Sequence, residues 1–395
     1  MANAAVMNGA PTRGGTNQSQ SNKGKAPTKA RPFLLASVEH RESTGYDVST
    51  AMTTSVQTLP DITIPAYGYL RSILLVVTTS LGAGTGVTAQ PDAPFNLLSN
   101  IVLQEPNGAQ ICNFPSGYDL FLANKFGGYW YQNDPRTSAN FSVALGTAMN
   151  ASFVLRVPVE VSCRDALGAL PNQNSGALFR IKMNLNTVGS VFAGTLTTPP
   201  TVRIRAFTEA WDQPEDSTDG VPNQTVPPAL NTTQYWTRQD FPVNAGSANV
   251  RLTRMGNYLR NLIFIYRDGS GVRSTQDANM PDPAVLYYDT RPLDNVARPV
   301  WLEQIMQRYG YGAVVGNTNS AAGTLLAVDS GLGRESSVWP YDFCHEFNGE
   351  VGRENRDLWL PTLSSTRFEI GGSWGATGTL SVLTNDVTIT GNVWL

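Results

Sequence analysis

The chain has 395 residues, which is long enough for about two domains. Only 15% of the residues are charged, compared with about 25% in typical proteins, and 36 glycines and 25 prolines indicate many turns. The net charge of −3 excludes a polycation that binds nucleic acid along its whole length, and three scattered cysteines exclude a disulfide framework. We therefore expect a β-rich protein that buries much of its surface against copies of itself, with a secreted β protein as the alternative.

The start of the chain, MANAAVMNGA, lacks the basic segment and apolar core of a secretory signal peptide. The longest aliphatic run, Ile73 to Val77, is far shorter than the roughly 20 residues that span a bilayer. The sequence therefore predicts a chain that is made and kept in a cytoplasm, or that assembles there.

Residues 1–38 contain five basic residues and no acidic one, so the rest of the chain has a net charge of about −8. Residues 1–32 also contain almost no large apolar side chain and cannot bury enough surface to offset chain entropy. We predict that residues 1–38 form a basic, flexible arm that orders on a partner, with a merely solvated tail as the alternative. The candidate contacts to an anionic surface are Arg13, Lys23, Lys25, Lys29 and Arg31.

Residues 39–210 are predicted to form a first β domain. Apolar residues 97–103 and 109–114 flank Asn107-Gly108, a pair that tolerates the positive φ angles of a hairpin turn. Residues 153–161 alternate between apolar and polar side chains, which indicates a strand with one buried face.

A helix is predicted between these strands. Ser116 and Asp119 have the spacing of a capping box, and Gly127 is a natural end. The predicted apolar stripe of this helix comprises Tyr118, Phe121 and Leu122.

Residues 211–232 are rich in Pro, Asp, Asn and Thr and are predicted to link the first domain to a second β domain, residues 233–395. A second helix is expected from Pro299 to a stop at Gly310. Its predicted apolar stripe comprises Leu302, Ile305, Met306 and Tyr309. The chain is expected to end in short strands separated by turns, with apolar positions Leu380, Val382, Val387, Ile389 and Val393.

The two predicted domains share landmarks in the same order. Tyr69-Leu70-Arg71 recurs as Tyr258-Leu259-Arg260, and Phe179 corresponds to Phe368 at the same offset. The remaining pairs are Arg164-Asp165 with Arg356-Asp357 and Leu170-Pro171 with Leu360-Pro361. A repeat of this length indicates a whole domain built twice. With about eight short strands in each half, the predicted fold is all-β, with two tandem eight-stranded jelly rolls and short flanking helices.

These features together resemble the double jelly-roll major capsid proteins of tailless icosahedral DNA viruses, most closely those of tectivirus-type bacteriophages with an internal membrane. The resemblance covers roughly residues 40–395 and rests on residues 64–71, 93–101, Asn107-Gly108 and 164–171, taken with the repeat.

The resemblance implies a structural protein rather than an enzyme, without cofactor, metal or small-molecule substrate. It implies homotrimers with a pseudo-hexagonal outline that tile an icosahedral virion shell over an internal membrane. The implied partners are neighbouring trimers, penton or spike and minor capsid proteins, and an anionic membrane or genome contacted by the arm. The implied location is the virion capsid, assembled in the host cytoplasm.

Other chemistry has weaker support in the sequence. Cys344 and His345 are adjacent, so in an extended segment they point to opposite faces, which disfavours a nucleophilic pair. Residues 82–86 are glycine-rich but lack the Lys-Ser/Thr ending of a phosphate loop and are expected to form a flexible loop.

The aromatic residues 129–131 and Trp236 suggest either a sugar platform or, more simply, packing in a core or between subunits. The alternatives to a capsid protein are therefore a tandem jelly-roll lectin or receptor-binding spike, and a jelly-roll glycan amidase.

Overall fold

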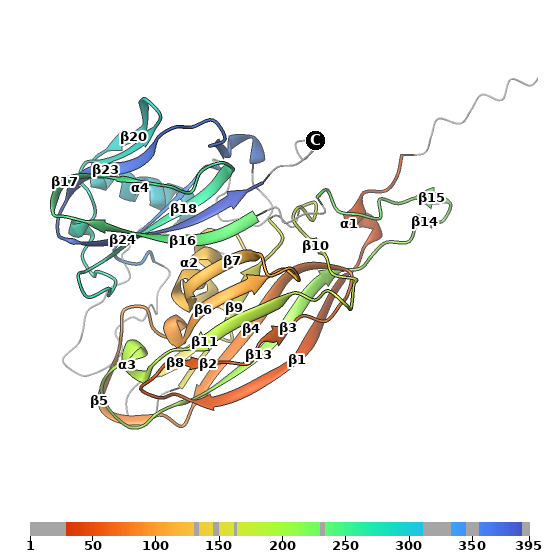
Figure 1. Cartoon of the computed structure of the whole chain (residues 1–395), viewed down its shortest axis with the longest axis horizontal. Helices are drawn as coiled ribbons and strands as arrows, with labels where there is room; N and C mark the ends of the chain where they lie inside the picture. Colours follow the sequence, from red (N-terminus) through yellow and green to blue (C-terminus); the bar gives the residue numbers. More distant parts are fainter. Residues whose placement is uncertain are drawn as a thin grey trace, which may run out of the picture.

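The computed structural model describes residues 29–129, 134–144, 150–161, 164–229, 234–310, 333–344 and 355–388. Two β halves lie against each other, and a narrow extension leaves the first half at one end (Figure 1). This extension comprises the short helix α1 (Phe33–Ala36) and the hairpin of β14 (Ser217–Thr218) and β15 (Val221–Pro222).

The first half is built from two facing sheets. One has the order β1 (Glu39–Ala51), β13 (Thr201–Trp211), β4 (Tyr69–Ser80), β9 (Asn150–Pro158) and β8 (Ser142–Ala144), with β10 (Leu170–Pro171) beside β4. The other has the order β2 (Gln57–Thr58), β11 (Arg180–Leu185), β6 (Leu98–Gln104) and β7 (Gln110–Ser116), with β3 (Ile62–Thr63) beside β11. A separate ribbon pairs β5 (Ala83–Ala89) with β12 (Phe192–Thr198).

The second half repeats the eight main strands of this arrangement; β3, β5, β8 and β12 have no counterpart among its described strands. One group of strands has the order β16 (Gln234–Val243), β24 (Gly378–Val387), β18 (Tyr258–Arg267) and β21 (Val338–Asp342), with β22 (Leu360–Pro361) beside β18. The other sheet has the order β17 (Gly246–Arg251), β23 (Phe368–Trp374), β19 (Ala284–Tyr288) and β20 (Arg291–Val296). Thus β1-β13-β4-β9 corresponds to β16-β24-β18-β21, and the sheet that ends in β7 corresponds to the sheet that ends in β20. The predicted pair of eight-stranded jelly rolls is confirmed.

The sequence landmarks take equivalent places in the two halves. Leu170 pairs with Leu70 and Leu360 pairs with Leu259, so each Leu-Pro landmark lies beside the start of its Tyr-Leu-Arg strand. The strand pairing also skips the arginine of each Tyr-Leu-Arg copy, since register shifts occur at Arg71 in β4 and at Arg260 in β18. A β-bulge of this kind re-aims a side chain, so both arginines are directed by the same local irregularity.

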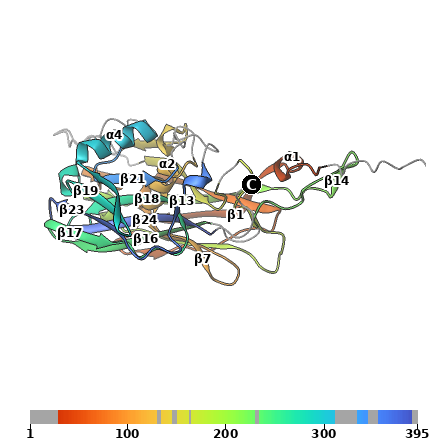
Figure 2. The same cartoon turned by 90° about the horizontal axis from the view of Figure 1, so that it is seen from above.

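The two longer helices follow their predicted limits but not their predicted faces. Helix α2 (Gly117–Phe126) has the capping box, with Ser116 accepting from the backbone N–H of Tyr118 and Asp119 accepting from the backbone N–H of Ser116. All ten of its residues are buried, so the predicted stripe was too narrow a description: α2 has no solvent-facing side. Figure 2 shows α2 and α4 on the same side of the sheets.

Helix α4 (Arg298–Tyr309) ends at Gly310, which adopts the left-handed conformation with φ of 72°. Its buried residues are Trp301, Ile305 and Tyr309, spaced four apart. The predicted stripe was wrong for Met306, whose side chain is 40% exposed, because the helix is rotated to bury Trp301 against the sheet. The remaining short helical turns are α3 (Val188–Val191), η1 (Phe95–Leu97), η3 (Pro135–Thr137), η4 (Asp277–Asn279) and η5 (Arg356–Leu358).

Two other local predictions were wrong. Glycine-rich residues 83–89 form strand β5 rather than a flexible loop, because β12 supplies a partner that the local sequence does not show. Strand β24 runs unbroken from Gly378 to Val387, where short strands were expected; Ile389 and Val393 lie outside the described residues. The alternation is confirmed for residues 153–157 of β9, but the strand ends at Pro158 and residues 158–161 are all buried, so the predicted polar positions Pro158 and Glu160 do not face solvent.

Candidate functional site

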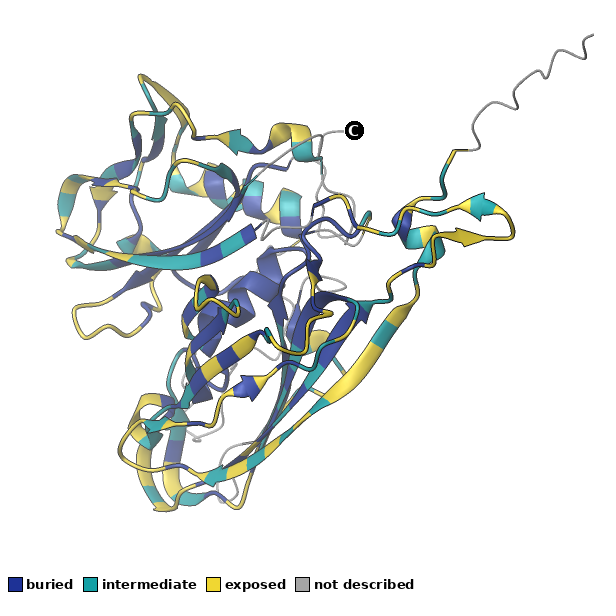
Figure 3. Cartoon of the chain, turned by 45° about the vertical axis from the view of Figure 1, so that its right-hand side comes forward, coloured by how far each residue is buried: buried dark blue, intermediate teal, exposed yellow. Residues whose placement is uncertain are grey.

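The candidate functional site is the contact between the two halves, which we call the junction. It is formed by α2, β7 and residues 134–136 of the first half, and by β16, β18 and residues 333–335 of the second half. Strands β7 and β16 pair in parallel where Cys112 lies opposite Trp236, so one ten-stranded sheet crosses the junction. Trp236 is fully buried with its ring 6.1 Å from that of Phe114, so for this residue the predicted core packing is confirmed. Figure 3 shows that residues on both sides of the junction are buried.

A balanced set of two acids and two bases is sealed in the junction. Lys125 Nζ lies 2.7 Å from Glu335 Oε1 and 3.3 Å from Asp134 Oδ2. Arg136 Nη2 lies 2.6 Å from Asp134 Oδ2 and 3.1 Å from Glu335 Oε1. All four side chains are at most 3% exposed. Burial alone would raise the pKa of Asp134, but Lys125 and Arg136 outweigh it and lower that pKa. Because Glu335 is the only member from the second half, separating the halves would leave uncompensated buried charge.

The C-terminal end of α2 is capped by the second half. Buried Arg260 donates from Nη2 to the carbonyl oxygen of Gly127 at 2.7 Å, and Asn261 Nδ2 donates to that of Phe126 at 3.2 Å. The last carbonyls of a helix have no intrahelical partner and carry partial negative charge, so a buried guanidinium is well suited to them. The arginine of the second Tyr-Leu-Arg copy therefore fastens the second half to the helix of the first.

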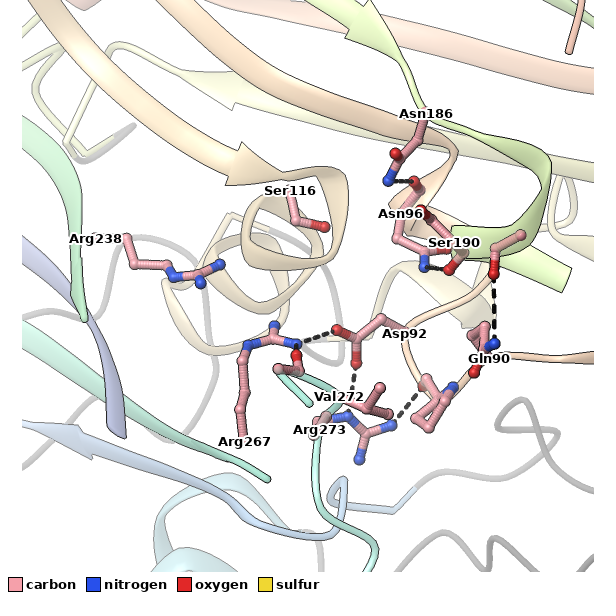
Figure 4. Close-up of a pocket in the computed structure, with 13 residues that line it drawn as sticks. Gln90, Asp92, Asn96, Ser116, Asn186, Ser190, Arg238, Arg267, Val272 and Arg273 are labelled. Atoms are coloured by element: carbon pink, nitrogen blue, oxygen red, sulfur yellow. Dashed lines mark hydrogen bonds and ion pairs between the residues drawn. The ribbon is translucent and has the colours of Figure 1, made fainter. Parts of the chain in front are cut away.

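A polar pocket of about 310 Å³ lies beside the junction (Figure 4). Asp92 accepts from Arg267 Nη1 at 2.8 Å and from Arg273 Nε at 2.9 Å. Arg238 also lines the pocket and forms ion pairs with Asp119 and Asp240. Burial opposes ionisation of Asp92, but Arg267 and Arg273 outweigh it and lower its pKa. The three arginines are thus neutralised by carboxylates of the same chain, and the pocket ties Asp92 of the first half to the second half.

The two Arg-Asp landmarks of the sequence meet in the structure. Arg356 Nη1 of the second half lies 2.6 Å from Asp165 Oδ2 of the first half, and their contact is bidentate. Sequence analysis found these residues as a repeat, not as partners. They form a further ionic link between the halves.

Of the predicted arm residues, Lys29 and Arg31 lie at the narrow end of the molecule. Arg13, Lys23 and Lys25 lie outside the described residues. Within residues 31–38, Phe33 is buried, with its ring 5.3 Å from that of Tyr69 at a T-shaped angle, while Leu35 and Val38 are exposed. The backbone of Arg31 also pairs with Pro222 and Gln224, so the end of the arm is bound to the segment between the halves.

Residues with possible catalytic or ligand-binding roles are dispersed. The thiols of Cys112 and Cys344 are buried, and burial raises the pKa of Cys112 to about 12; Cys163 and His345 lie outside the described residues. Within the described part of the chain, no group of three His, Cys, Asp or Glu side chains could hold a metal ion. Over the same residues, no helix is long and apolar enough to cross a bilayer.

The aromatic residues do not form an exposed platform where the structure describes them. Tyr129 donates from its hydroxyl to Gln234 Oε1 at 2.7 Å, and its ring lies 6.4 Å from Trp236 inside the junction. The other two residues of the aromatic run, 130 and 131, lie outside the described residues.

No protein-family model and no curated protein matches the chain. The crystal structure of the STIV major capsid protein, however, superposes with a TM-score of 0.57 at 13% identity, over 89% of this chain and 97% of that one. The fold is the double jelly roll. A second structure, from Sulfolobus turreted icosahedral virus, gives the same TM-score and identity over 89% of this chain and 90% of that chain. The major capsid protein P2 of bacteriophage PM2 gives a TM-score of 0.47 at 11% identity, over 90% and 99% of the two chains.

The charged members of the junction were not predicted from the sequence. Lys125 follows the apolar run 120–123 and Asn124 and precedes Phe126 in a predicted helix, and a lysine so close to apolar residues is the one local signal that a buried partner exists. Its partner Glu335 is far away in the sequence, so no local pattern connects the two.

Proposed function

We propose that this chain is the major capsid protein of an icosahedral virus and that it acts as a structural protein, not as an enzyme. In this proposal three copies form a pseudo-hexagonal trimer, and trimers tile the virion shell. The observation that carries it is the equivalence of the eight main strands in two jelly rolls fixed in one chain by the junction. Three such chains supply six similar barrels, so a threefold ring fills a sixfold position. The capsid proteins whose structures share this fold support the same role.

The trimer can be tested by size-exclusion chromatography with light scattering. The expected mass is three times that of the 42.7 kDa chain. Electron microscopy of the same fraction should show particles with a hexagonal outline. A protein that remains monomeric at high concentration would contradict the proposal.

We also propose that the arm faces the inside of the shell and contacts an anionic layer, either an internal membrane or the genome. The support is charge: five basic residues and no acid occur in residues 1–38. Each basic residue near an anionic membrane surface contributes about 1 kcal/mol, and many trimers bind the same surface together. Neighbouring trimers, penton or spike proteins and minor capsid proteins are the further partners, and assembly takes place in the host cytoplasm.

The arm proposal can be tested with vesicles. A chain lacking residues 1–28 should fold and trimerise like the full chain but bind vesicles containing phosphatidylserine more weakly. Vesicles of phosphatidylcholine alone are the control. A second control replaces Arg13, Lys23 and Lys25 by glutamine and keeps the length of the arm. Equal binding by all three proteins would exclude a role for these charges.

A further inference from the structure

The junction uses one free edge from each half. Strand β7 ends its sheet in the first half, and β16 ends its group of strands in the second. The equivalent of β7 in the second half is β20, and the equivalent of β16 in the first half is β1. Among the described residues, β20 pairs only with β19, and β1 pairs only with β13. The edges of β7 and β16 therefore pair within the chain. The equivalent edges of β20 and β1 have no partner strand among the described residues.

The residue of β20 that corresponds to Cys112 of β7 follows from the strand register. In each half, the cross-strand partners of the edge strand lead through the middle strand to the strand that begins near the phenylalanine landmark, β11 in the first half and β23 in the second. The partners are Cys112–Leu103–Ile181 in the first half and Asp294–Leu286–Ile370 in the second. Ile181 and Ile370 are equivalent, because each lies two positions after the phenylalanine landmark of its half. Asp294 is thus the equivalent of Cys112.

The residue of β1 that corresponds to Trp236 of β16 is found in the same way. The partners are Arg41–Glu209–Ser72 in the first half and Trp236–Asn385–Asn261 in the second. Ser72 and Asn261 are equivalent, because each directly follows the arginine of its Tyr-Leu-Arg copy. Arg41 is thus the equivalent of Trp236, and the pair Cys112–Trp236 of the junction corresponds to the pair Asp294–Arg41.

The charges of this second pair are complementary. Arg41 forms ion pairs with Glu39 and Glu209, each at 2.7 Å, and Arg71 and Arg156 contact the same two acids. Arg41 is the most exposed member of this cluster, with 59% of its side chain accessible, and its Nε and Nη2 contact Glu209 and Glu39 of the same chain. Asp294 is partly exposed on the largely exposed strand β20, and within its own half it interacts with Tyr341 and Arg308.

The helices next to these edges also differ in how far they are covered. Helix α2 lies beside β7 and is buried on every side. Its equivalent α4 follows β20 but exposes Val300 by 48% and Met306 by 40%. Helix α2 is thus covered by the rest of the chain, whereas its equivalent α4 leaves apolar side chains exposed. Such exposed apolar side chains indicate that another copy covers this face of α4.

We propose that β20 and the exposed face of α4 of one copy dock on the outer edge of β1 of the next copy, with Asp294 opposite Arg41. This inference rests on the proposed trimer and names its contact surface. The contact is head-to-tail, and such contacts close into a ring when the rotation between copies allows it. It also covers two strand edges that would otherwise template aggregation.

A disulfide trap in the full chain tests the register. Paired neighbouring strands lie about 4.8 Å apart, which is within the range of about 4.4–6.8 Å between the Cα atoms of a disulfide. The variant Arg41→Cys with Asp294→Cys should give covalent dimers and trimers on a non-reducing denaturing gel, and only monomers after reduction. The matched control is Ser49→Cys with Asp294→Cys, because Ser49 is exposed on β1 and its partner Arg203 is six residues along β13 from Glu209, the partner of Arg41, which is about 20 Å. The single variants control for native cysteines.

The outcomes separate this inference from the proposed function. One result would refute the docking of β20 on β1 but leave the capsid proposal standing. In that result light scattering gives a trimer, and the control pair forms cross-links but the Arg41 pair does not. A strictly monomeric protein would overturn both. If Arg41→Cys fails to fold, as judged by thermal unfolding, the pair Glu42→Cys with Asn295→Cys, one position further along each strand, is the replacement. Absence of cross-links in that pair within an intact trimer also overturns the edge.

Discussion

Replacing Lys125 by methionine should weaken the junction severely. The change keeps the length of the side chain in a helix position with no exposure but removes its charge. At an effective dielectric constant of about 20, the 2.7 Å contact to Glu335 corresponds to about 6 kcal/mol of attraction and the 3.3 Å contact to Asp134 to about 5. Desolvation of the ions offsets much of this attraction, and Arg136 still faces both acids, so the attractive terms overstate the net effect. Breaking a buried pair on one side typically costs about 3–5 kcal/mol of unfolding free energy, and we expect a loss in this range.

A double variant tests the physical reason. In Lys125→Met with Glu335→Gln, the remaining pair of Arg136 and Asp134 is again balanced. The double variant should lose less unfolding free energy than the sum of the losses in the two single variants. The difference should be roughly 1–3 kcal/mol, as found for residues in one ion-pair network. The exposed lysine Lys182 supplies the matched control, since Lys182→Met should change stability by less than about 0.5 kcal/mol.

The assay is guanidinium unfolding at one fixed protein concentration, because association with other copies adds to apparent stability. Intrinsic fluorescence of the eight tryptophans, which include Trp236 in the junction, follows the unfolding. A loss below about 1 kcal/mol for Lys125→Met would refute the reasoning. Strict additivity in the double variant would do so as well, because it would mean that Lys125 and Glu335 are not coupled.

Three further changes have distinct expected results. The pKa of Asp92 is lower in the folded protein than its ordinary value of 3.8. Its ion pairs therefore stabilise the fold fully at pH values above 3.8, and this stabilisation is lost as the pH falls through the pKa of the folded state. At pH 7 the Asp92→Asn variant should therefore unfold at a lower denaturant concentration than the unchanged chain. The difference between the two unfolding midpoints should become smaller below pH 3.8, and a difference that does not change with pH would contradict the ion pairs of Asp92 as its cause. Gly68→Ala should cost at least about 1 kcal/mol more than Gly45→Ala, because both glycines have positive φ but only at Gly68 would a Cβ strike the backbone of Trp211. Arg356→Ala should lower the unfolding midpoint as much as Asp165→Ala does, and unequal effects would show that the two side chains act separately.

The repeat made much of the fold predictable. Strand alternation in residues 153–157, the capping box at Ser116 and the stop at Gly310 are local signals, and each is where the sequence placed it. Matching landmarks at a fixed offset then indicated two domains without any knowledge of pairing.

Features that depend on a distant partner were not predictable from local pattern. Strand β5 is rich in glycine and alanine and forms only because β12, which follows much later in the first half, pairs with it. The face of α4 was misjudged because the helix buries Trp301 beside Trp339 of β21, a contact that the spacing of apolar residues does not reveal. The junction itself joins side chains that lie far apart in the sequence, so its charges looked like ordinary solvated residues.

The repeated arginine shows how one inherited position acquired two different roles. Arg260 crosses the junction to Gly127, whereas Arg71, at the same bulge in the first half, is held at 2.6 Å by Glu160 of its own half. The neighbouring positions differ in the same way. The junction has Gln234, Trp236 and Asn385 where the first half has Glu39, Arg41 and Glu209.

The permanent contact within a chain is thus apolar or neutral at the positions where the proposed contact between chains is charged. A charged contact is sensitive to screening, since the Debye length falls from about 10 Å at 0.1 M salt to about 3 Å at 1 M. Raising NaCl over this range should shift the protein from trimer towards monomer in light scattering while leaving the folded chain's intrinsic tryptophan fluorescence, to which Trp236 contributes, unchanged. A trimer that is equally stable at both salt concentrations would mean that apolar residues such as Val300 and Met306, and not the Arg41–Asp294 pair, dominate the contact between copies.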